Sequence, residues 1–217
     1  MFHFGSFRNF KHYYLHYIGV HLRDDFLRQL SYNRFIEIEH KVFASMMFFL
    51  NVDCFGQCTG ITFVDSTKIC VCRNKRIKRN KVFDGIAQVG KSTMGWFYGF
   101  KLHLVCNDKG ELLSFCLTPG NVDDRDQQTL KTLTQNLFGK LFGDKGYISP
   151  SLFDMLFNDG IHLVTGIRSN MKNRLMSMHD KILLRKCSVI ETINDELKNI
   201  CQVEHTRHRA MHNFVMN

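Results

Sequence analysis

Three short segments of this chain each carry one acidic residue in a setting that suits phosphoryl chemistry with divalent metal ions. Asp65 ends a β-rich run, Asp144 ends a second short strand, and Glu191 lies in a segment with helical periodicity. Three carboxylates from distant parts of a chain can hold two Mg²⁺ ions against a phosphodiester, because Mg²⁺ binds a few carboxylate oxygens together with water and phosphate. We therefore expect Asp65, Asp144 and Glu191 to be catalytic residues and metal ligands, with two Mg²⁺ ions, or Mn²⁺, as cofactors.

Each of these acidic residues also has a purely structural explanation. Asp65 can form an Asx turn with the hydroxyl residues that follow it, and Asp144 can belong to a tight turn between glycines. Glu191 follows Ser188 by three residues, as in a capping box, where it would complement the helix dipole. Asp195 lies one helical turn after Glu191 on the same face and is the main alternative for the third ligand.

Positive charge gathers in two segments that flank the acidic residues. Six of the nine residues from 73 to 81 are Lys or Arg, a density that favours contact with DNA phosphates over an ordinary solvated loop. The second segment, residues 168–186, contains Arg168, Lys172, Arg174 and Lys181 in addition to two cations close to Glu191. The DNA-binding residues that we expect from these segments and from the turn after Asp144 are Arg73, Lys75, Arg76, Lys78, Arg79, Lys81, Lys145, Arg185 and Lys186.

The composition is that of a basic globular chain. Its 217 residues carry a net charge of +9, which favours a polyanionic partner. The eight cysteines include no C-x-x-C pair and lie mostly in apolar stretches, so we expect a reduced, cytoplasmic setting. The longest uncharged apolar run, residues 42–52, is too short to cross a bilayer, and the N-terminus lacks a signal-peptide pattern, so no membrane partner is expected.

The chain divides into an N-terminal helical part and a longer part with strand periodicity. Residues 7–52 have apolar residues at helical spacing, and Ser31 is the expected N-cap of a helix over 32–49. Two helices joined near Ser31 are consistent either with the remnant of a helix-turn-helix or with a pair that packs on the next domain. We expect a helical N-terminal region over residues 1–58, for which the remnant of a DNA-binding domain is one of the two interpretations, and an α/β domain over 59–217.

The α/β part begins with strands and then alternates strands with helices. The apolar and β-branched runs predict strands over 61–65, 97–106, 112–118, 141–144 and 162–167, the second and third forming a hairpin turned at residues 107–110.

Helices are predicted between these strands. Asp123 or Asp124 is expected to cap a helix that contains Leu130, Leu133 and Leu137. Further helices are expected from Pro150 to about residue 158 and over 188–201. The resulting succession, βββαβαβα, predicts a ribonuclease-H-like α/β fold with a mixed sheet.

Histidines and aromatic residues give weaker signals. The cationic cluster at 205–209 contains two histidines, and His12 and His16 have helical spacing, but no Cys or carboxylate set completes a zinc site with either group. Trp96 and its two aromatic neighbours can stack on bases, yet their place at the start of a hairpin strand favours core or edge packing.

Several motifs, in this order, resemble those of bacterial insertion-sequence transposases of the DDE type. The closest resemblance is to the insertion sequence 982 family, which is related to the insertion sequence 4 group, and it covers residues 31–213. It implies a ribonuclease-H-like catalytic domain in which Asp65, Asp144 and Glu191 are the metal-binding triad, and a DNA-contacting lysine seven residues after the glutamate, here Lys198. The motifs are Phe63–Lys68, Gly95–His103, Gly120–Arg125, Gly143–Tyr147 and Ile190–Asp195.

Two departures from the family pattern accompany this resemblance. The related insertion sequence 4 group has a tyrosine and an arginine ahead of the glutamate at positions occupied here by Leu184 and Cys187. That DNA contact is therefore expected to be absent or moved to Arg185 and Lys186. Family proteins also have more sequence before the point that matches Met1 and after the point that matches Asn217, so the chain resembles a member truncated at both ends.

The resemblance implies a DNA transposase that cleaves phosphodiester bonds at insertion-sequence ends and joins the freed 3′-hydroxyl to target DNA. Its expected partner is double-stranded DNA, both element ends and target, with a homodimer bringing two ends together. The alternative is a catalytically inactive DNA-binding remnant of a truncated transposase. A third possibility is a host metal-dependent nuclease or phosphatase on the same fold.

Overall fold

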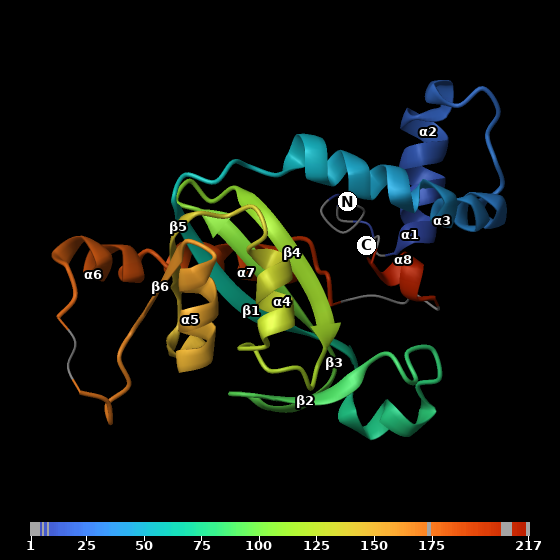
Figure 1. Ribbon diagram of the computed structural model, residues 1–217. Helices are drawn as coiled ribbons and strands as arrows, with labels where there is room; N and C mark the ends of the chain where they lie inside the picture. Colours follow the sequence, from blue (N-terminus) through green and yellow to red (C-terminus); the bar gives the residue numbers. More distant parts are fainter. Residues whose placement is uncertain (1–4, 6, 8, 173–174, 205–209, 216–217) are drawn as a thin grey trace. The chain divides into compact units, whose positions relative to one another are not determined.

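The structure is a computed structural model that describes residues 5, 7, 9–172, 175–204 and 210–215 (Figure 1). The chain forms two compact units, Met1–Asp53 with Asp195–Asn217, and Cys54–Asn194. The expected division into residues 1–58 and 59–217 remains a proposal. Arg174 and the cationic cluster at 205–209 lie outside the described residues. Among the helices that the structure describes, none is both long enough and apolar enough to cross a membrane.

The first unit is helical and has an aromatic core of its own. The predicted helix over 32–49 is confirmed with its cap, since the Ser31 Oγ accepts a hydrogen bond from the Arg34 N–H at 3.4 Å. The Phe35 ring contacts Phe10 at 6.0 Å and Tyr14 at 5.3 Å between centroids, so the N-terminal helical segment packs on α3. The helices of this unit are α1 (Phe10–Tyr13), a π-helical turn (Tyr14–Ile18), α2 (Gly19–His21), a 3₁₀ turn (Arg23–Asp25), α3 (Tyr32–Phe49) and α8 (Met211–Val215).

The second unit is built on a six-stranded mixed sheet. Its order is β2-β3-β1-β5-β6, with β4 also pairing with β3. β3 is antiparallel to β1, β2 and β4, whereas β5 is parallel to β1 and β6. An antiparallel group followed by parallel strands joined through a helix is the predicted ribonuclease-H-like arrangement, and the predicted fold class is confirmed. The strands are β1 (Ile61–Cys72), β2 (Gln88–Ser92), β3 (Gly95–Asn107), β4 (Leu112–Pro119), β5 (Gly139–Gly143) and β6 (Ile161–Thr165).

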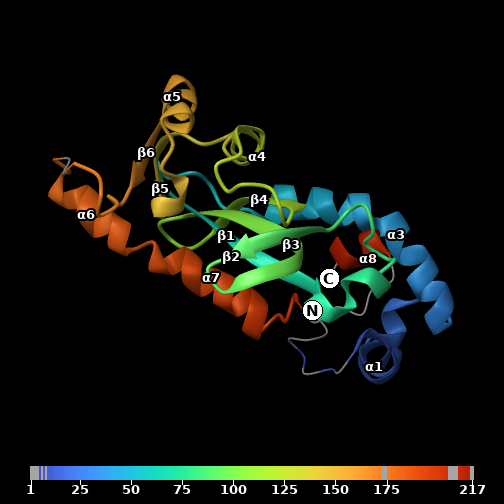
Figure 2. The same cartoon turned by 90° about the horizontal axis from the view of Figure 1, so that it is seen from below.

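Helices cover both faces of this sheet (Figures 1 and 2). α4 (Gln127–Leu133) and α5 (Pro150–Asn158) lie on one face, and the part of α7 (Ser188–Asn199) up to Asn194 lies on the other. Leu130 and Leu133 from α4 and Leu152 and Leu156 from α5 are buried in the main hydrophobic core. The sheet contributes Val64, Val105, Leu141, Ile161 and Leu163 to the same core. Since side chains alternate along a strand, the residue after Val64 faces α7.

Several predicted elements are confirmed where the signal is local. α5 begins at Pro150 and ends at Asn158, as predicted. The β3–β4 turn at 107–110 is held by the buried Asn107, whose Oδ1 accepts hydrogen bonds from two backbone N–H groups of the turn at 3.0 Å. The predicted cap of α4 was wrong, because Asp126 caps it and accepts from the Thr129 N–H at 2.8 Å.

The strand β2 and the helix α6 (Met178–Arg185) were not predicted, and β1 is much longer than predicted. β2 is an edge strand that pairs with β3 alone, and its sequence lacks the alternating apolar residues from which a half-buried strand is predicted. α6 is capped by Ser177 and tied to β5 by an ion pair of 2.7 Å between Asp180 and Lys140, but its sequence is dominated by charge. β1 continues seven residues beyond Asp65 to Cys72, because β3 remains paired with it there.

Gly139 starts β5 in a conformation that other residues rarely adopt. Its φ is +85°, and a Cβ at this position would lie 2.4 Å from the Gly60 carbonyl oxygen. The same carbonyl accepts a hydrogen bond of 2.8 Å from the Lys140 N–H. The close approach of these two backbones therefore sets where β5 begins beside β1.

We expect Gly139→Ala to destabilise the protein more than Gly160→Ala. Gly160 has a φ of +79° but open space around its Cα, so alanine there adds only the conformational cost, about 1 kcal/mol. Alanine at position 139 adds the clash with Gly60 to that cost. The measurement is the free energy of unfolding in urea, and equal losses for the two variants would contradict the packing role of Gly139.

Candidate active site

The parallel register of β1 and β5 brings two of the three predicted acidic residues together. Val64 pairs with Gly143, the last residue of β5, so Asp65 and Asp144 follow side by side. Asp144 lies at a strand end, as predicted. Asp65 does not, because β1 continues along β3 after β5 has stopped. The end of β5 thus leaves β1 without its parallel neighbour at Asp65, which opens one side of that residue.

Asp65 is largely buried, and its carboxyl has a strongly raised pKa. Its Oδ2 accepts a hydrogen bond of 2.8 Å from the Asn194 side-chain amide on α7. Burial is the main cause that raises the pKa of the Asp65 carboxyl, and the negative charges of Asp144 and Glu191 add to this effect. Hydrogen bonds from the Ser66 backbone N–H and from Asn194 lower the pKa, and the resulting value is about 6. The Asp65 carboxyl is therefore close enough to both Asp144 and Glu191 to be affected by their charges.

Asp144 and Glu191 are more exposed than Asp65. The Asp144 Oδ1 accepts a hydrogen bond of 2.7 Å from the Gly146 N–H and so caps the short 3₁₀ turn Lys145–Tyr147. The tight-turn explanation of Asp144 is thus true of the structure, although it leaves the second carboxylate oxygen available. Glu191 lies in the first turn of α7, three residues before Asn194, the residue that contacts Asp65.

Carboxylates of this kind are suitable ligands for a hard divalent ion. Across the residues that the structure describes, however, no three His, Cys, Asp or Glu side chains are grouped closely enough to hold a metal ion. Like charges without a cation between them disfavour close approach, and the negative charges of Asp144 and Glu191 accordingly raise the pKa of Asp65. The three carboxylates are suitable ligands for a divalent cation. A bound cation would also offset the negative charges that raise the pKa of Asp65, although the described residues do not form a preassembled metal site.

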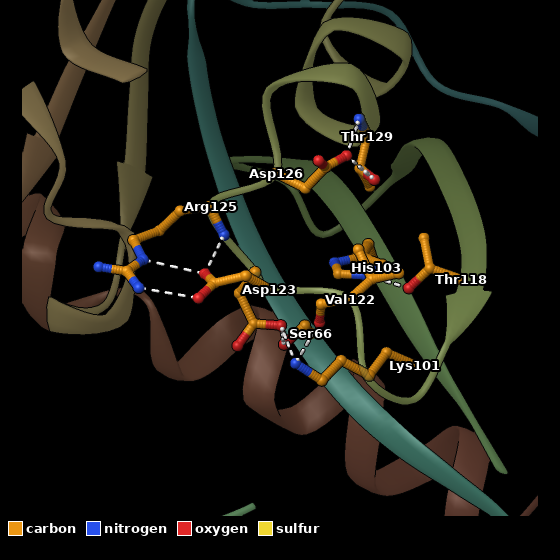
Figure 3. A network of polar contacts seen from close by, with 10 residues as sticks. Ser66, Lys101, His103, Thr118, Val122, Asp123, Arg125, Asp126 and Thr129 are labelled. Carbon is orange, nitrogen blue, oxygen red and sulfur yellow. Dashed lines mark hydrogen bonds and ion pairs between the residues drawn. The ribbon is translucent and has the colours of Figure 1, made fainter. Parts of the chain in front are cut away.

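A polar network on the other face of the sheet holds β1, the strand that carries Asp65, and its neighbour β3 (Figure 3). Lys101 on β3 donates hydrogen bonds to the Val122 carbonyl oxygen at 2.8 Å and to Asp124 Oδ1 at 3.0 Å. Ser66, the neighbour of Asp65, donates to the same Asp124 oxygen at 2.8 Å. One carboxylate thus ties the loop before α4 to both central strands.

His103 belongs to the same region and is fully buried. It shares a hydrogen bond of 2.9 Å with the Thr118 hydroxyl (Figure 3). Burial lowers the pKa of the His103 imidazole, an effect that the nearby carboxylates oppose. We therefore assign His103 a structural role in the β3–β4 pairing rather than a role in proton transfer.

The predicted DNA-binding residues are mostly at the surface. The six cations of residues 73–81 are exposed on and around a 3₁₀ segment, Asn74–Arg79, and within the described part of the chain none of them forms an ion pair. Lys145, Arg185 and Lys186 are also exposed. Lys198 lies in the part of α7 that belongs to the first unit, with its Nζ 4.0 Å from a Glu204 oxygen.

Sequence reasoning missed two residues of this region. Asn194 is an uncharged residue within the predicted helix over 188–201, and only its contact with Asp65 shows its importance. Asp124 was considered as a helix cap, whereas it is the acceptor for Lys101 and Ser66. Its place next to Asp123 in a Gly-Asn-Val-Asp-Asp run was a signal of a polar loop but not of its partners.

A family model described as "Transposase DDE domain" matches residues 55–211, well over half of the chain. The chain belongs to the transposase DDE domain family. No curated protein matches it.

Two solved structures are similar to this DDE domain protein. One is the piggyBac transposase synaptic complex with hairpin DNA, at 14% identity and a TM-score of 0.41 over 65% of this chain and 31% of that chain. The other is the simian T-cell lymphotropic virus intasome in complex with the PP2A regulatory subunit B56 gamma, at 13% identity and a TM-score of 0.32 over 80% of this chain and 54% of that chain. The DDE domain protein thus spans less than two thirds of either chain.

We expect the stability of the metal-free DDE domain protein to depend on Asp65 and on pH. Because burial raises the pKa of Asp65 from 3.8 to about 6, the folded state holds this proton more tightly than the unfolded state, and stability falls as pH rises from about 4 to above 6. Asp65→Asn keeps an acceptor for Asn194 but removes the charge. The advantage of the variant in the free energy of unfolding should grow by roughly 2 kcal/mol between pH 4.5 and pH 7.5.

The measurement is urea unfolding of both proteins with a chelator present at the two pH values. Asp154→Asn, at an exposed acidic residue of α5, is the control and should show little pH-dependent difference. A stability advantage of Asp65→Asn that does not change with pH would contradict the raised pKa of Asp65.

Proposed function

We propose that this DDE domain protein is a bacterial transposase of the insertion sequence 982 kind, which cleaves DNA at the ends of its element and joins the freed 3′-hydroxyl to target DNA. The observation that carries the proposal is the position of Asp144 beside Asp65 at the end of β5, with Glu191 close enough to raise the pKa of Asp65. Three carboxylates in one electrostatic environment are what metal-dependent phosphoryl transfer requires.

Within this proposal, Asp65 and Asp144 are the ligands shared by the two ions, and Glu191 holds one of them from α7. Two divalent ions, Mg²⁺ or Mn²⁺, supply Lewis-acid activation of the attacking water or 3′-hydroxyl and stabilise the leaving oxygen when bound. Asn194 orients the Asp65 carboxylate through its 2.8 Å hydrogen bond. Burial of Asp65 limits access of water to that carboxylate, which strengthens its interaction with a cation.

The exposed cations give the site a means of holding its substrate. The segment from Arg73 to Lys81 follows β1 directly, and Arg185 and Lys186 precede α7, so they flank the two elements that carry Asp65 and Glu191. Lys145 lies next to Asp144 itself. We propose that these residues and Lys198 contact phosphates of double-stranded DNA, and that two copies of the chain bring two element ends together.

The second candidate function is that of a catalytically inactive DNA-binding remnant. This alternative requires the exposed basic segments but does not require the three carboxylates to hold metal ions. It shares the basic segments with the transposase proposal and therefore also predicts DNA binding. The two candidates differ in whether a divalent ion binds and whether DNA is cut.

We expect DNA cleavage to require each of the three acidic residues. Asp65→Asn, Asp144→Asn and Glu191→Gln should each lower Mg²⁺- or Mn²⁺-dependent nicking of end-containing duplex by at least roughly 100-fold, because each removes a metal ligand. Asn194→Ala, which removes only a residue that orients a ligand, should lose roughly 10-fold. Asp154→Asn is the control, an exposed acidic residue whose removal should leave nicking unchanged.

A second measurement does not depend on cleavage. Mn²⁺ or Mg²⁺ should raise the Tm of the native protein, because an ion that binds the folded state alone stabilises it, and should not raise the Tm of Asp65→Asn. Undiminished nicking by Asp65→Asn or Asp144→Asn would rule out the catalytic assignment. Binding of DNA by the native protein without nicking and without a metal-induced rise in Tm would favour the inactive remnant.

The salt dependence of DNA binding tests the basic segment. Lys75→Gln with Lys78→Gln should reduce the slope of log K against log salt concentration by roughly 1 to 2, since each phosphate contact contributes about 0.9 to that slope. The matched control is Lys109→Gln with Lys131→Gln, which removes the same charge from exposed positions outside the segment. Equal slopes for both double variants would show that the segment makes no special phosphate contact.

A further inference from the structure

Trp96 is the only tryptophan of the chain and one of its most exposed large apolar residues. It is the second residue of β3, and its side chain is 63% exposed, whereas the next two residues, Phe97 and Tyr98, are buried. The predicted packing role thus holds for these two neighbours and not for Trp96. A flat aromatic side chain left open to solvent at a fixed strand position is suited to bind a ligand with its own flat face.

Trp96 lines a pocket of about 410 Å³ at the edge of the sheet. Val89, Gly90 and Lys91 of β2 form one side of the pocket, and the loop from Gly120 to Asp124 forms another. A Cβ at Gly90 would lie 2.0 Å from the Gly120 carbonyl oxygen, so the strand and the loop contact each other through their backbones. The pocket volume falls within the range of roughly 300 to 1,000 Å³ that is usual for ligand sites.

The charges around this pocket favour an anion. The Lys91 Nζ lies 5.7 Å from the centroid of the Trp96 ring, and within the described residues it forms no ion pair. The two acidic residues of the pocket are already compensated, Asp123 by Arg125 at 2.8 Å and Asp124 by Lys101 at 3.0 Å. The uncompensated charge is therefore positive.

The pocket also adjoins the basic segment. The Asn74 side-chain amide donates a hydrogen bond of 2.9 Å to the Trp96 carbonyl oxygen, and Asn74 is the first residue of the 3₁₀ segment that carries the exposed cations. Lys91 thus lies over an exposed aromatic ring, and a hydrogen bond to the backbone of the same residue connects it to the segment that carries the exposed cations. Alternation of a stacking surface with positive charge is the usual design of a single-strand binding site.

We propose that Trp96 and Lys91 form a binding site for an unpaired nucleotide of the DNA substrate, with the base stacked on the indole ring and its phosphate held by Lys91. The inference rests on the proposed function, since cleavage at an element end is what would provide unpaired nucleotides. A duplex is not the preferred ligand, because the faces of its bases are covered by neighbouring base pairs.

The fluorescence of the native chain tests this proposal directly, because all tryptophan emission comes from Trp96. Titration with an unlabelled oligothymidylate should quench the emission, while a blunt duplex of equal length should change it much less. Binding of each DNA is followed in parallel by the anisotropy of a labelled copy. Both titrations are done without divalent ions, so that no DNA is cut.

Variants separate stacking from charge. Trp96→Ala should weaken oligothymidylate binding by roughly fivefold or more and leave duplex binding unchanged, whereas Trp96→Phe should retain most of the affinity. The matched control is Met94→Ala, which removes an exposed apolar side chain in the β2–β3 turn, two residues before Trp96. Circular dichroism of Trp96→Ala confirms that the variant is folded.

Two results would overturn the proposal and leave the proposed function standing. One is tight oligothymidylate binding without a change in Trp96 emission. The other is equal affinity of native protein and Trp96→Ala for the oligothymidylate. Conversely, quenching by single-stranded DNA in a protein that never nicks duplex DNA would support the nucleotide site while contradicting the transposase activity.

Discussion

The parallel pairing of β1 with β5 is the constraint on which the rest of the proposed site depends. It brings together two acidic residues that are 79 positions apart in the sequence, because the residues that precede them, Val64 and Gly143, are paired. A partly buried carboxylate beside two others is unfavourable for the folded protein, as the raised pKa of Asp65 indicates. Such a cost is common at functional sites, where the local arrangement serves binding rather than stability.

The surrounding structure holds β1 from both faces. On the α7 face, Asn194 donates a hydrogen bond to the Asp65 carboxylate. On the other face, Ser66 donates a hydrogen bond to Asp124, which also forms an ion pair with Lys101. The side chains of two consecutive residues of β1 are thus held by hydrogen bonds on opposite faces of the sheet. A carboxylate on such a strand has little freedom to move away from its neighbours, and this rigidity is a requirement of precise metal binding.

Acidic residues with ion-pair partners and cations without such partners occupy different segments of the described part of the protein. Asp123, Asp124 and Asp180 have cationic partners close by. The Asp124 pair ties the loop before α4 to β3, and the Asp180 pair ties α6 to β5, whereas Asp123 pairs with Arg125 within the loop. The cations of residues 73–81 lack such partners in the described part of the chain and lie next to an exposed tryptophan. Acidic residues with partners and cations without them are consistent with a positive surface that meets a polyanion.

The sequence by itself determined the elements whose signals are local. The Ser31 cap of α3, the start of α5 at Pro150 and the β3–β4 turn at residues 107–110 all depend on neighbouring residues, and these predictions were confirmed. The predicted strands and helices of the sheet unit also occur in the predicted order, with β2 and α6 in addition. The tertiary structure alone decided that β1 runs past Asp65, that β2 joins the sheet as an edge, and that Asn194 reaches a carboxylate 129 residues away. Strand register, edge pairing and side-chain partners depend on contacts between distant segments, and no local pattern of residues encodes them.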